Sequence, residues 1–279
     1  MIIVTGANGF IGSNLIKVLH DQGNSVLGMD YESRNYNPSI IQSPAEDFYS
    51  NLSSYLKNAT AVFHEGAISS TTETDKRKLF KYNINCTMKL MYYCRDNDIP
   101  MQYASSASVY GNMSINEWHN PNKPMNPLNN YANSKKQCDY LAEMLISSTR
   151  PPQLLQGMRY FNVYGPNEDH KGDQSSPHHK FKKQLLETGK IKLFEGSKEF
   201  LRDFISVEEV INLKLKAFDT MPSGIYDVGT SKPKSFYEVA VQVCQENGIE
   251  NATDYIEWIS MPNNLSSHYQ KYSCANMCW

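Results

Sequence analysis

Short apolar runs alternate with amphipathic stretches along most of the chain. Residues 1–6, 25–30 and 59–67 are apolar runs bounded by turn-forming residues, as buried strands are. Between the first two runs, residues 8–23 carry apolar side chains at the three- and four-residue spacing of an amphipathic helix. The chain therefore begins with the pattern of a strand, a helix and a second strand.

The same alternation continues to residue 166. We expect further strands within 100–111 and 154–166, and helices within 79–98 and 129–148. Strands that alternate with helices predict a parallel sheet covered on both faces, with ligands at the carboxyl ends of the strands. The expected fold class is therefore α/β, with a doubly wound parallel Rossmann sheet.

The pattern changes after Gly165, where a polar, turn-rich segment precedes more helix and strand signals. We expect a smaller mixed C-terminal lobe that binds the substrate. The predicted dinucleotide-binding domain is 1–161 plus about 203–230. The predicted substrate lobe is about 162–202 plus 231–279.

Composition and charge narrow the classes of protein. The net charge of −2 gives no electrostatic reason to expect nucleic acid or an anionic membrane as a partner. No apolar run approaches the ~20 residues that a membrane span needs, and the N-terminus has no signal-peptide pattern. The six cysteines lack C-x-x-C spacing and the seven histidines are unclustered. We expect a cytoplasmic homo-oligomer with reduced thiols and no metal.

A glycine-rich turn joins the first strand to the first helix. In "TGANGFIG", Gly6, Gly9 and Gly12 allow a tight turn and a close approach of the backbone to a pyrophosphate. The helix N-terminus that follows offers free N–H groups and the positive end of its dipole. This turn predicts a dinucleotide site.

The end of the second strand carries two conflicting signals about the cofactor. Asp30 lies where an acid accepts hydrogen bonds from the adenosine ribose, which favours NAD. Arg34 follows within reach of a 2′-phosphate, which favours NADP. The sequence leaves both cofactors open.

Tyr131 and Lys135, in "YANSK", are one helical turn apart and so share a helix face. Removing hydride from a secondary alcohol requires a base for the hydroxyl proton. A free phenol ionises near pH ~10, so it needs a neighbouring cation to act near neutrality. The pair is therefore a candidate proton-transfer device beside a nicotinamide.

Four strings occur in a characteristic order: "TGANGFIG", "SSASVYG" (105–111), "YANSK" and "RYFNVYGP" (159–166). Together they resemble the extended short-chain dehydrogenase/reductase family, also called the NAD-dependent epimerase/dehydratase family, whose members act on nucleotide sugars. The resemblance implies that Tyr131 is the acid/base, that Lys135 holds the cofactor ribose, and that Ser106 binds the reacting oxygen.

Three further strings, "FHEGAISSTTE" (63–73), "YFNVYGPNEDHKG" (160–172) and "KLFEGSKEFLRDF" (192–204), are similar to one branch of that family. That branch inverts carbon 6 of an ADP-linked heptose by transient oxidation to a ketone with bound NADP, and returns hydride to the opposite face. The similarity runs from residue 1 to about Tyr269. It also implies that Lys171 is the second proton-transfer group; the alternative is an exposed loop lysine that binds a phosphate.

The resemblance assigns further residues to the site. Expected cofactor neighbours, besides the glycines, Asp30, Arg34 and Lys135, are Phe10, Ile11, Tyr31, Glu65, Gly66, Ala67, Ile68, Ser69, Asn83, Val163 and Lys171. Expected substrate neighbours, besides Ser106, are Ser70, Asn162, Asp173, Lys180, Phe194, Glu195, Gly196, Ser197, Arg202 and Tyr269. The guanidinium of Arg202 suits a diphosphate, with a surface ion pair to Asp203 or Glu199 as its alternative.

Two departures from the family pattern stand out. Asp173 and Lys180 replace the Ser and His typical of the substrate site, which could alter the sugar accepted. The chain also stops at Trp279, so we expect a shortened substrate lobe.

Other functions remain open at this point. One is a different nucleotide-sugar enzyme, such as a UDP-hexose 4-epimerase or a reductase. A dehydratase is disfavoured because Ala107 and Ser108, rather than an acidic pair, follow Ser106. The other is a non-catalytic NADP-binding protein, which the presence of Ser106, Tyr131 and Lys135 disfavours.

Overall fold

The computed structural model describes residues 1–31, 40–42, 45–118, 120, 123–262 and 270–276. Its centre is a seven-stranded sheet in the order β11-β6-β5-β4-β1-β2-β3, in which every pairing is parallel. The seven strands are β1 (Ile2–Thr5), β2 (Val26–Asp30), β3 (Ile40–Gln42), β4 (Ala61–His64), β5 (Met101–Ser106), β6 (Leu155–Tyr160) and β11 (Gly224–Val228). The predicted fold class, a doubly wound parallel α/β sheet, is confirmed.

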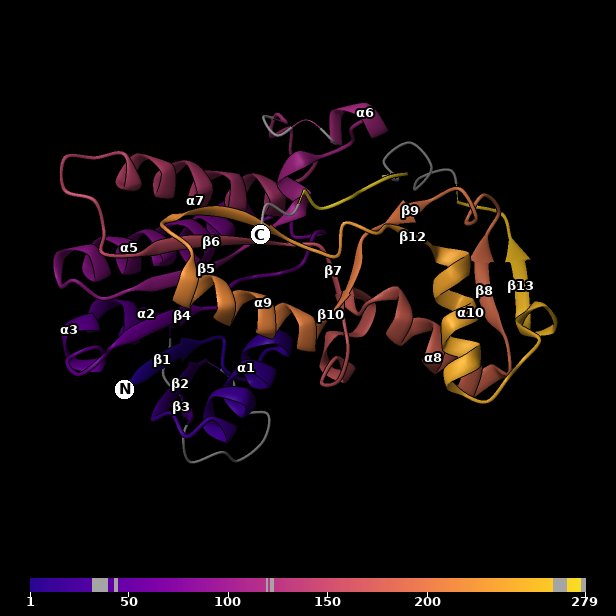
Figure 1. Cartoon of the computed structure of the whole chain (residues 1–279), viewed down its shortest axis with the longest axis horizontal. Helices are drawn as coiled ribbons and strands as arrows, with labels where there is room; N and C mark the ends of the chain where they lie inside the picture. The colour runs from indigo at the N-terminus through magenta and orange to yellow at the C-terminus, as the bar shows by residue number, and fades with distance from the viewer. Residues whose placement is uncertain (32–39, 43–44, 119, 121–122, 263–269, 277–279) are drawn as a thin grey trace.

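Helices cover both faces of this sheet (Figure 1). On one face lie α1 (Phe10–Asp21) and α9 (Val207–Thr220), whose apolar stripes pack with Val4 and Phe63 of the strands. On the other face lie α5 (Cys86–Asp96) and α7 (Asn130–Ile146). Strands covered on both sides read as continuous apolar runs, which is the pattern seen in β1 and β4.

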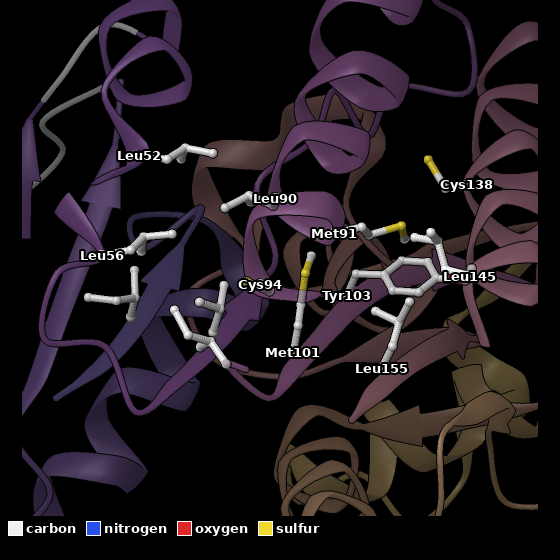
Figure 2. Packing of buried hydrophobic residues seen from close by; sticks show 14 of the residues in the cluster. Leu52, Leu56, Leu90, Met91, Cys94, Met101, Tyr103, Cys138, Leu145 and Leu155 are labelled. Atoms are coloured by element: carbon white, nitrogen blue, oxygen red, sulfur yellow. The ribbon is translucent and has the colours of Figure 1, made fainter. Parts of the chain in front are cut away.

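The larger core cluster fills the space between the sheet, α5 and α7. Leu90 and Met91 of α5 pack over Met101 and Tyr103 of β5, with Leu145 of α7 beside them (Figure 2). All five side chains are buried. The cluster fixes α7 against β5, and with it the candidate catalytic residues on that helix.

The helix predicted over 79–98 is not regular. A short α4 (Lys76–Leu79) leads into a π-helix, η1 (Phe80–Asn85), and only then into α5. Asp75 caps α4 by accepting hydrogen bonds from the backbone N–H groups of Arg77 and Lys78. A π-turn holds more residues than an α-turn, so it displaces the side chains around the axis.

The single strand predicted over 154–166 is two strands in different sheets. β6 ends at Tyr160, and β7 (Asn162–Tyr164) pairs with β10 (Phe204–Ser206) in a separate two-stranded sheet. The break falls at Phe161, whose N–H donates to Val228 O while the next N–H donates to Asp203 O. A continuous apolar run does not show where the chain changes partners.

The C-terminal lobe stands beside the main sheet (Figure 1). Its own core joins Phe181 and Leu185 of one helix to Val239 and Val243 of another. Its elements are α8 (Pro177–Thr188), β8 (Ile191–Phe194), β9 (Leu201–Arg202), β12 (Lys234–Ser235), α10 (Phe236–Glu246) and β13 (Ile256–Ile259). β13 pairs with β8, and β12 with β9.

Short helices complete the described chain: α2 (Ala45–Ser50), α3 (Leu52–Tyr55), α6 (Ile115–Trp118), and the 3-10 helices η2 (Ala107–Tyr110), η3 (Asp169–Gln174) and η4 (Ala252–Tyr255). Within the described residues, no helix has the length and apolar character that crossing a membrane requires. The five described cysteines are buried free thiols.

Candidate active site

The glycine turn joins β1 to α1 with very little space around it. Gly6 has a φ of +68°, and a Cβ there would lie 2.6 Å from the backbone N of Gly66. Gly9 donates its N–H to Gly6 O at 2.9 Å, and a Cβ on Gly12 would clash with the same carbonyl. Only glycine meets these requirements, because side chains rarely tolerate that φ and neither neighbour is a movable side chain.

The start of α1 suits an anionic group. Gly9 is its N-cap and contributes no side-chain hydrogen bond, and the first turn contains no acidic residue. The N–H groups of such a helix end lack intrahelical partners and lie at the positive end of the dipole. Phe10 is buried beneath the turn and Ile11 is partly buried against the same core.

Asp30, the last residue of β2, lies against the glycine turn. Its two carboxylate oxygens accept the N–H groups of Asn8 at 2.8 Å and Tyr31 at 2.7 Å. The Tyr31 side chain is largely exposed. Arg34, on which the preference for NADP was predicted to depend, lies outside the described residues, so the choice between NAD and NADP stays a prediction.

The predicted acid/base pair is buried on α7. Tyr131 is 9% and Lys135 4% exposed, and the ammonium nitrogen lies 6.0 Å from the centre of the Tyr131 ring. That ammonium also donates to Ala104 O of β5 at 2.8 Å. Asn129 caps the helix by accepting the N–H of Ala132. The helix start therefore places the Lys135 ammonium against the carboxyl end of β5, with the Tyr131 ring 6.0 Å from it.

Ser106 is the last residue of β5, two residues after Ala104, whose carbonyl accepts the hydrogen bond from Lys135. Its hydroxyl oxygen accepts from the N–H of Ser108 at 3.2 Å and from the Ser108 hydroxyl at 2.9 Å. Both contacts use the oxygen of Ser106 as acceptor. Its own proton is thereby left to donate to another oxygen, as a group that binds a reacting carbonyl must do.

The loop after β4 was expected to border the cofactor, and it divides into two parts. The carboxylate of Glu65 faces inward, where it pairs with the Lys214 ammonium at 2.7 Å and accepts from the Tyr160 hydroxyl at 3.0 Å. Burial lowers the pKa of Lys214 and raises that of Tyr160. Gly66 contacts the glycine turn. Of the other predicted cofactor neighbours, Ala67 and Ile68 are partly exposed and Ser69 is exposed; Ser70, a predicted substrate neighbour, is partly exposed.

Asn83, a predicted cofactor neighbour, is buried and its amide is bonded to other protein groups. It lies fully buried in η1, where its side chain both accepts from the N–H of Ile68 at 2.8 Å and donates to Ile68 O at 3.0 Å. A further bond runs to the Ser134 hydroxyl of α7 at 3.0 Å. Asn83 thus holds the loop after β4 to the helix that carries Tyr131 and Lys135.

Lys171 lies in η3, beside the glycine turn. Its side chain is 21% exposed, its ammonium is 3.2 Å from a Glu168 carboxylate oxygen, and it lies 4.7 Å from the centre of the Phe10 ring. Glu168 is buried and also accepts from the N–H groups of Gly165 and Ser176 and from the Ser176 hydroxyl. A second candidate proton-transfer group therefore lies against the cofactor turn, on a different segment from Tyr131.

Asn162 and Val163 follow β6, as predicted. The Asn162 amide donates to Asp203 O at 3.1 Å, and Val163 packs with the cores beside α9. The Asp203 carboxylate accepts the N–H groups of Thr230, Ser231 and Ala275.

The remaining predicted substrate residues belong to the C-terminal lobe. Lys180 donates to Asp173 O at 2.8 Å, so the two departures from the family pattern contact each other. Arg202 is 6% exposed, with its guanidinium 5.8 Å from the centre of the Phe236 ring. The other four lie at the end of β8 and in the turn that follows it: Phe194, Glu195, Gly196 and Ser197. Tyr269 lies outside the described residues.

Several residues that support this site were not singled out from the sequence. They are Thr5, His64, Thr87, Ser134, Glu168 and Lys214, all buried at their functional groups. The sequence strings contained Thr5, His64, Ser134 and Glu168, but each acts through partners that local spacing does not reveal. A buried polar residue inside an apolar run, such as His64 in "AVFH", was the one available signal.

Comparison with known proteins gives the class. Residues 2–229 match the model of the NAD dependent epimerase/dehydratase family. The chain belongs to that family, which confirms the predicted resemblance and, with it, an NAD(P)-dependent enzyme.

Particular relatives carry a narrower name. The ADP-L-glycero-D-manno-heptose-6-epimerase of Brachyspira hyodysenteriae is 38% identical over 289 residues, covering 99% of this chain and 89% of the relative. The enzyme of the same name from Alkalilimnicola ehrlichii is 38% identical over 294 residues, with the same coverage. The crystal structure of the Helicobacter pylori enzyme of that name superposes with a TM-score of 0.84 at 28% identity, covering 99% of this chain and 87% of that one.

Proposed function

We propose that this chain inverts carbon 6 of an ADP-linked heptose by oxidising the carbinol to a ketone and returning hydride to the opposite face, with NADP as cofactor. The observation that carries the proposal is the buried pair of Tyr131 and Lys135 beside Ser106. The names of two relatives at 38% identity support the substrate.

The residues around the glycine turn fit a dinucleotide. The uncapped start of α1 and the absence of side chains at Gly6, Gly9 and Gly12 suit a pyrophosphate, and Asp30 suits the adenosine end. When bound, the nicotinamide supplies the chemistry of accepting a hydride from the sugar carbon and giving it back. The protein's own residues must handle the proton and hold the oxygen.

Three side chains perform those tasks in the proposed mechanism. Tyr131 takes the hydroxyl proton as the ketone forms, and Lys135 stabilises the phenolate by its positive charge. Ser106 donates its free hydroxyl proton to the reacting oxygen. Burial strengthens both interactions, because charges act more strongly away from water.

Lys171 is proposed to exchange the proton when the ketone presents its other face. Inversion needs hydride to return to the opposite side, so the oxygen meets a different part of the site. Lys171 comes from a separate segment and lies against Phe10 of the cofactor turn, which suits that role. It must first leave Glu168, 3.2 Å away.

The deciding experiment compares Tyr131→Phe with Tyr140→Phe on the same helix. Each enzyme is given one carbon-6 epimer of the ADP-linked heptose, and the product is followed by chromatography. We expect Tyr131→Phe to retain its nucleotide and lose turnover, while Tyr140→Phe behaves as wild type. Unchanged turnover in Tyr131→Phe would contradict the mechanism.

Two companion measurements test the substrate and the cofactor. UDP-galactose should give no 4-epimer under conditions that convert the ADP-linked heptose; the reverse result would replace the proposed substrate. Nucleotide released by denaturing the purified protein should be NADP on mass analysis. Recovery of NAD alone would contradict the cofactor assignment.

A further inference from the structure

A buried histidine lies between the end of strand β1 and the start of helix α5. His64, the last residue of β4, is 3% exposed. Its Nδ1 lies 2.6 Å from the Thr5 hydroxyl oxygen, and its Nε2 lies 2.9 Å from the Thr87 hydroxyl oxygen. Thr5 ends β1 just before the glycine turn, and Thr87 lies in the first turn of α5. Both threonines are also buried.

The neighbouring bonds fix which imidazole nitrogen carries the proton. The Thr87 hydroxyl donates its one proton to Asn83 O at 2.6 Å, so toward His64 it must accept. Nε2 of His64 therefore donates. The other nitrogen is left to accept the Thr5 hydroxyl proton, while the Thr5 oxygen accepts the N–H of Gly66 at 3.2 Å. The hydrogen bonds from Gly66 through Thr5, His64 and Thr87 to Asn83 O then all run in one direction.

The charge state agrees with this arrangement. Burial, together with the positive charge of Lys135, lowers the pKa of His64 to about 3. The imidazole is therefore neutral under physiological conditions, as an acceptor at Nδ1 requires.

The chain of bonds continues at both ends into the site. At one end, Gly66 lies against Gly6 in the cofactor turn. At the other end, the side chain of Asn83 donates to the Ser134 hydroxyl at 3.0 Å, and that hydroxyl donates to Tyr131 O at 2.7 Å. A continuous buried path thus joins the glycine turn to the backbone of the candidate acid/base.

We propose that His64 is a positioning residue that, as its neutral Nε2–H tautomer, holds the cofactor turn and the Tyr131 helix in one fixed relation. The inference rests on the proposed function only in that Tyr131 transfers the proton. Hydride transfer requires the sugar carbon, the cofactor ring and the proton acceptor to keep their mutual geometry, and small displacements lower the rate steeply. The hydroxyl groups of Thr5, Thr87 and Ser134 and the neutral imidazole of His64 each have one proton to donate, so their bonds have one allowed direction, which limits such displacement.

Matched threonine variants separate the two ends of the path. Thr87→Val removes a hydroxyl from the Tyr131 side, and Thr87→Ser retains it; Thr5→Val and Thr5→Ser do the same on the cofactor side. We expect Thr87→Val to lower kcat by about tenfold with cofactor affinity nearly unchanged, a loss equal to one buried hydrogen bond. Thr5→Val should mainly weaken nucleotide affinity, and both serine variants should match wild type.

Two histidine variants provide a test that does not depend on the threonines. The amide nitrogen of His64→Gln reaches the place of Nε2 and can still donate to Thr87, whereas the shorter His64→Asn offers its amide near Nδ1. We expect Gln to retain more kcat than Asn. Equal loss in both, or a Thr87→Val enzyme whose kcat per folded molecule equals that of wild type, would overturn the proposal.

A readout free of the substrate distinguishes this proposal from the proposed function. Nitrogen-15 NMR of the histidines in the wild-type protein should give one neutral ring that titrates far below the others and is protonated at Nε2. An Nδ1–H tautomer, or a His64 charged near pH 6, would overturn the inference even if the enzyme is active. The expected spectrum without heptose turnover would instead reject the proposed function alone.

Discussion

Helix α7 carries two tyrosine–lysine pairs that differ in surroundings rather than in spacing. Tyr131 and Lys135 are four residues apart and buried, with 6.0 Å between the ammonium and the ring centre. Lys136 and Tyr140 are also four residues apart, with a shorter distance of 5.4 Å. Tyr140 is 43% exposed, and the Lys136 ammonium donates to Met125 O in a loop.

The contrast shows that proximity alone does not make a proton-transfer device. In water a cation 5 Å away changes a phenol little, because the high dielectric constant screens the interaction. The buried pair is surrounded by a medium of lower dielectric constant. It lies at the carboxyl end of β5, whose last residue is Ser106. The Lys135 ammonium thus contacts the strand that ends at Ser106, whereas the Tyr140 ring is exposed to solvent and the Lys136 ammonium contacts a loop carbonyl.

The largest expected effect falls on the phenol of the buried pair. Tyr131→Phe should lower kcat by about 10³-fold, the scale of a lost general base, while Tyr140→Phe should change it by less than about twofold. Steady-state rates with the ADP-linked heptose measure both. A large loss in Tyr140→Phe would show that burial does not distinguish the pairs.

The same contrast between buried and exposed pairs extends to stability. Glu65→Ala leaves the Lys214 ammonium buried without its carboxylate and should cost about 3 kcal/mol in the free energy of unfolding. Glu187→Ala removes the partner of Lys183 in a pair more than half exposed on both sides, and should cost less than about 0.5 kcal/mol. Urea denaturation of the two variants tests the ranking; equal losses would refute it.

The ammonium groups of the two tyrosine–lysine pairs allow a third comparison. Lys135→Met should lower kcat about 10²-fold and weaken nucleotide binding, because the cation beside Tyr131 is lost. Lys136→Met makes the same change of side chain in the exposed pair, and should leave kcat and nucleotide affinity within about twofold of wild type. Nucleotide affinity from fluorescence titration and kcat from product analysis give the two numbers; a matching loss in Lys136→Met would contradict the comparison.

The smallest effect is a pH dependence from His64. Its folded pKa of about 3 lies below the unfolded value of about 6.5, so between these pH values the unfolded chain binds the extra proton. Its contribution to stability should therefore fall by about 1.4 kcal/mol per pH unit as the pH drops below 6.5, and stay constant above. Unfolding free energies of wild type and His64→Gln at several pH values should differ in slope by that amount. Parallel curves would contradict it.

The sequence predicted the features that depend on local pattern. The glycine turn, the alternating strands and helices, and the helix that carries Tyr131 follow from spacing and turn chemistry within short windows. The roles of Ser106, Tyr131 and Lys135 came from a family resemblance, and the structure brings all three to neighbouring element ends.

Other features depend on partners far away along the chain, so no local pattern could reveal them. His64 binds Thr5, 59 positions before it, and Thr87, 23 positions after it. Asn83 lies within a stretch predicted as regular helix, because the apolar spacing of 79–98 does not mark the extra residue that a π-turn holds. The break at Phe161 depends on Asp203 and Val228, which lie on other strands or next to them.

Because of the π-helix over Phe80–Asn85, the orientation of Asn83 depends on the exact number of residues in this segment. Each residue of an α-helix turns the next side chain by about 100°, so deleting one residue between 80 and 82 would convert the bulge to regular helix and swing the Asn83 amide away from Ile68 and Ser134. Every side chain named in the mechanism would still be present. The loop after β4 and helix α7 would nevertheless lose the hydrogen bonds through which Asn83 joins them. A single deletion on the face of the sheet opposite α1 would therefore loosen the contact between the cofactor loop and the helix of Tyr131.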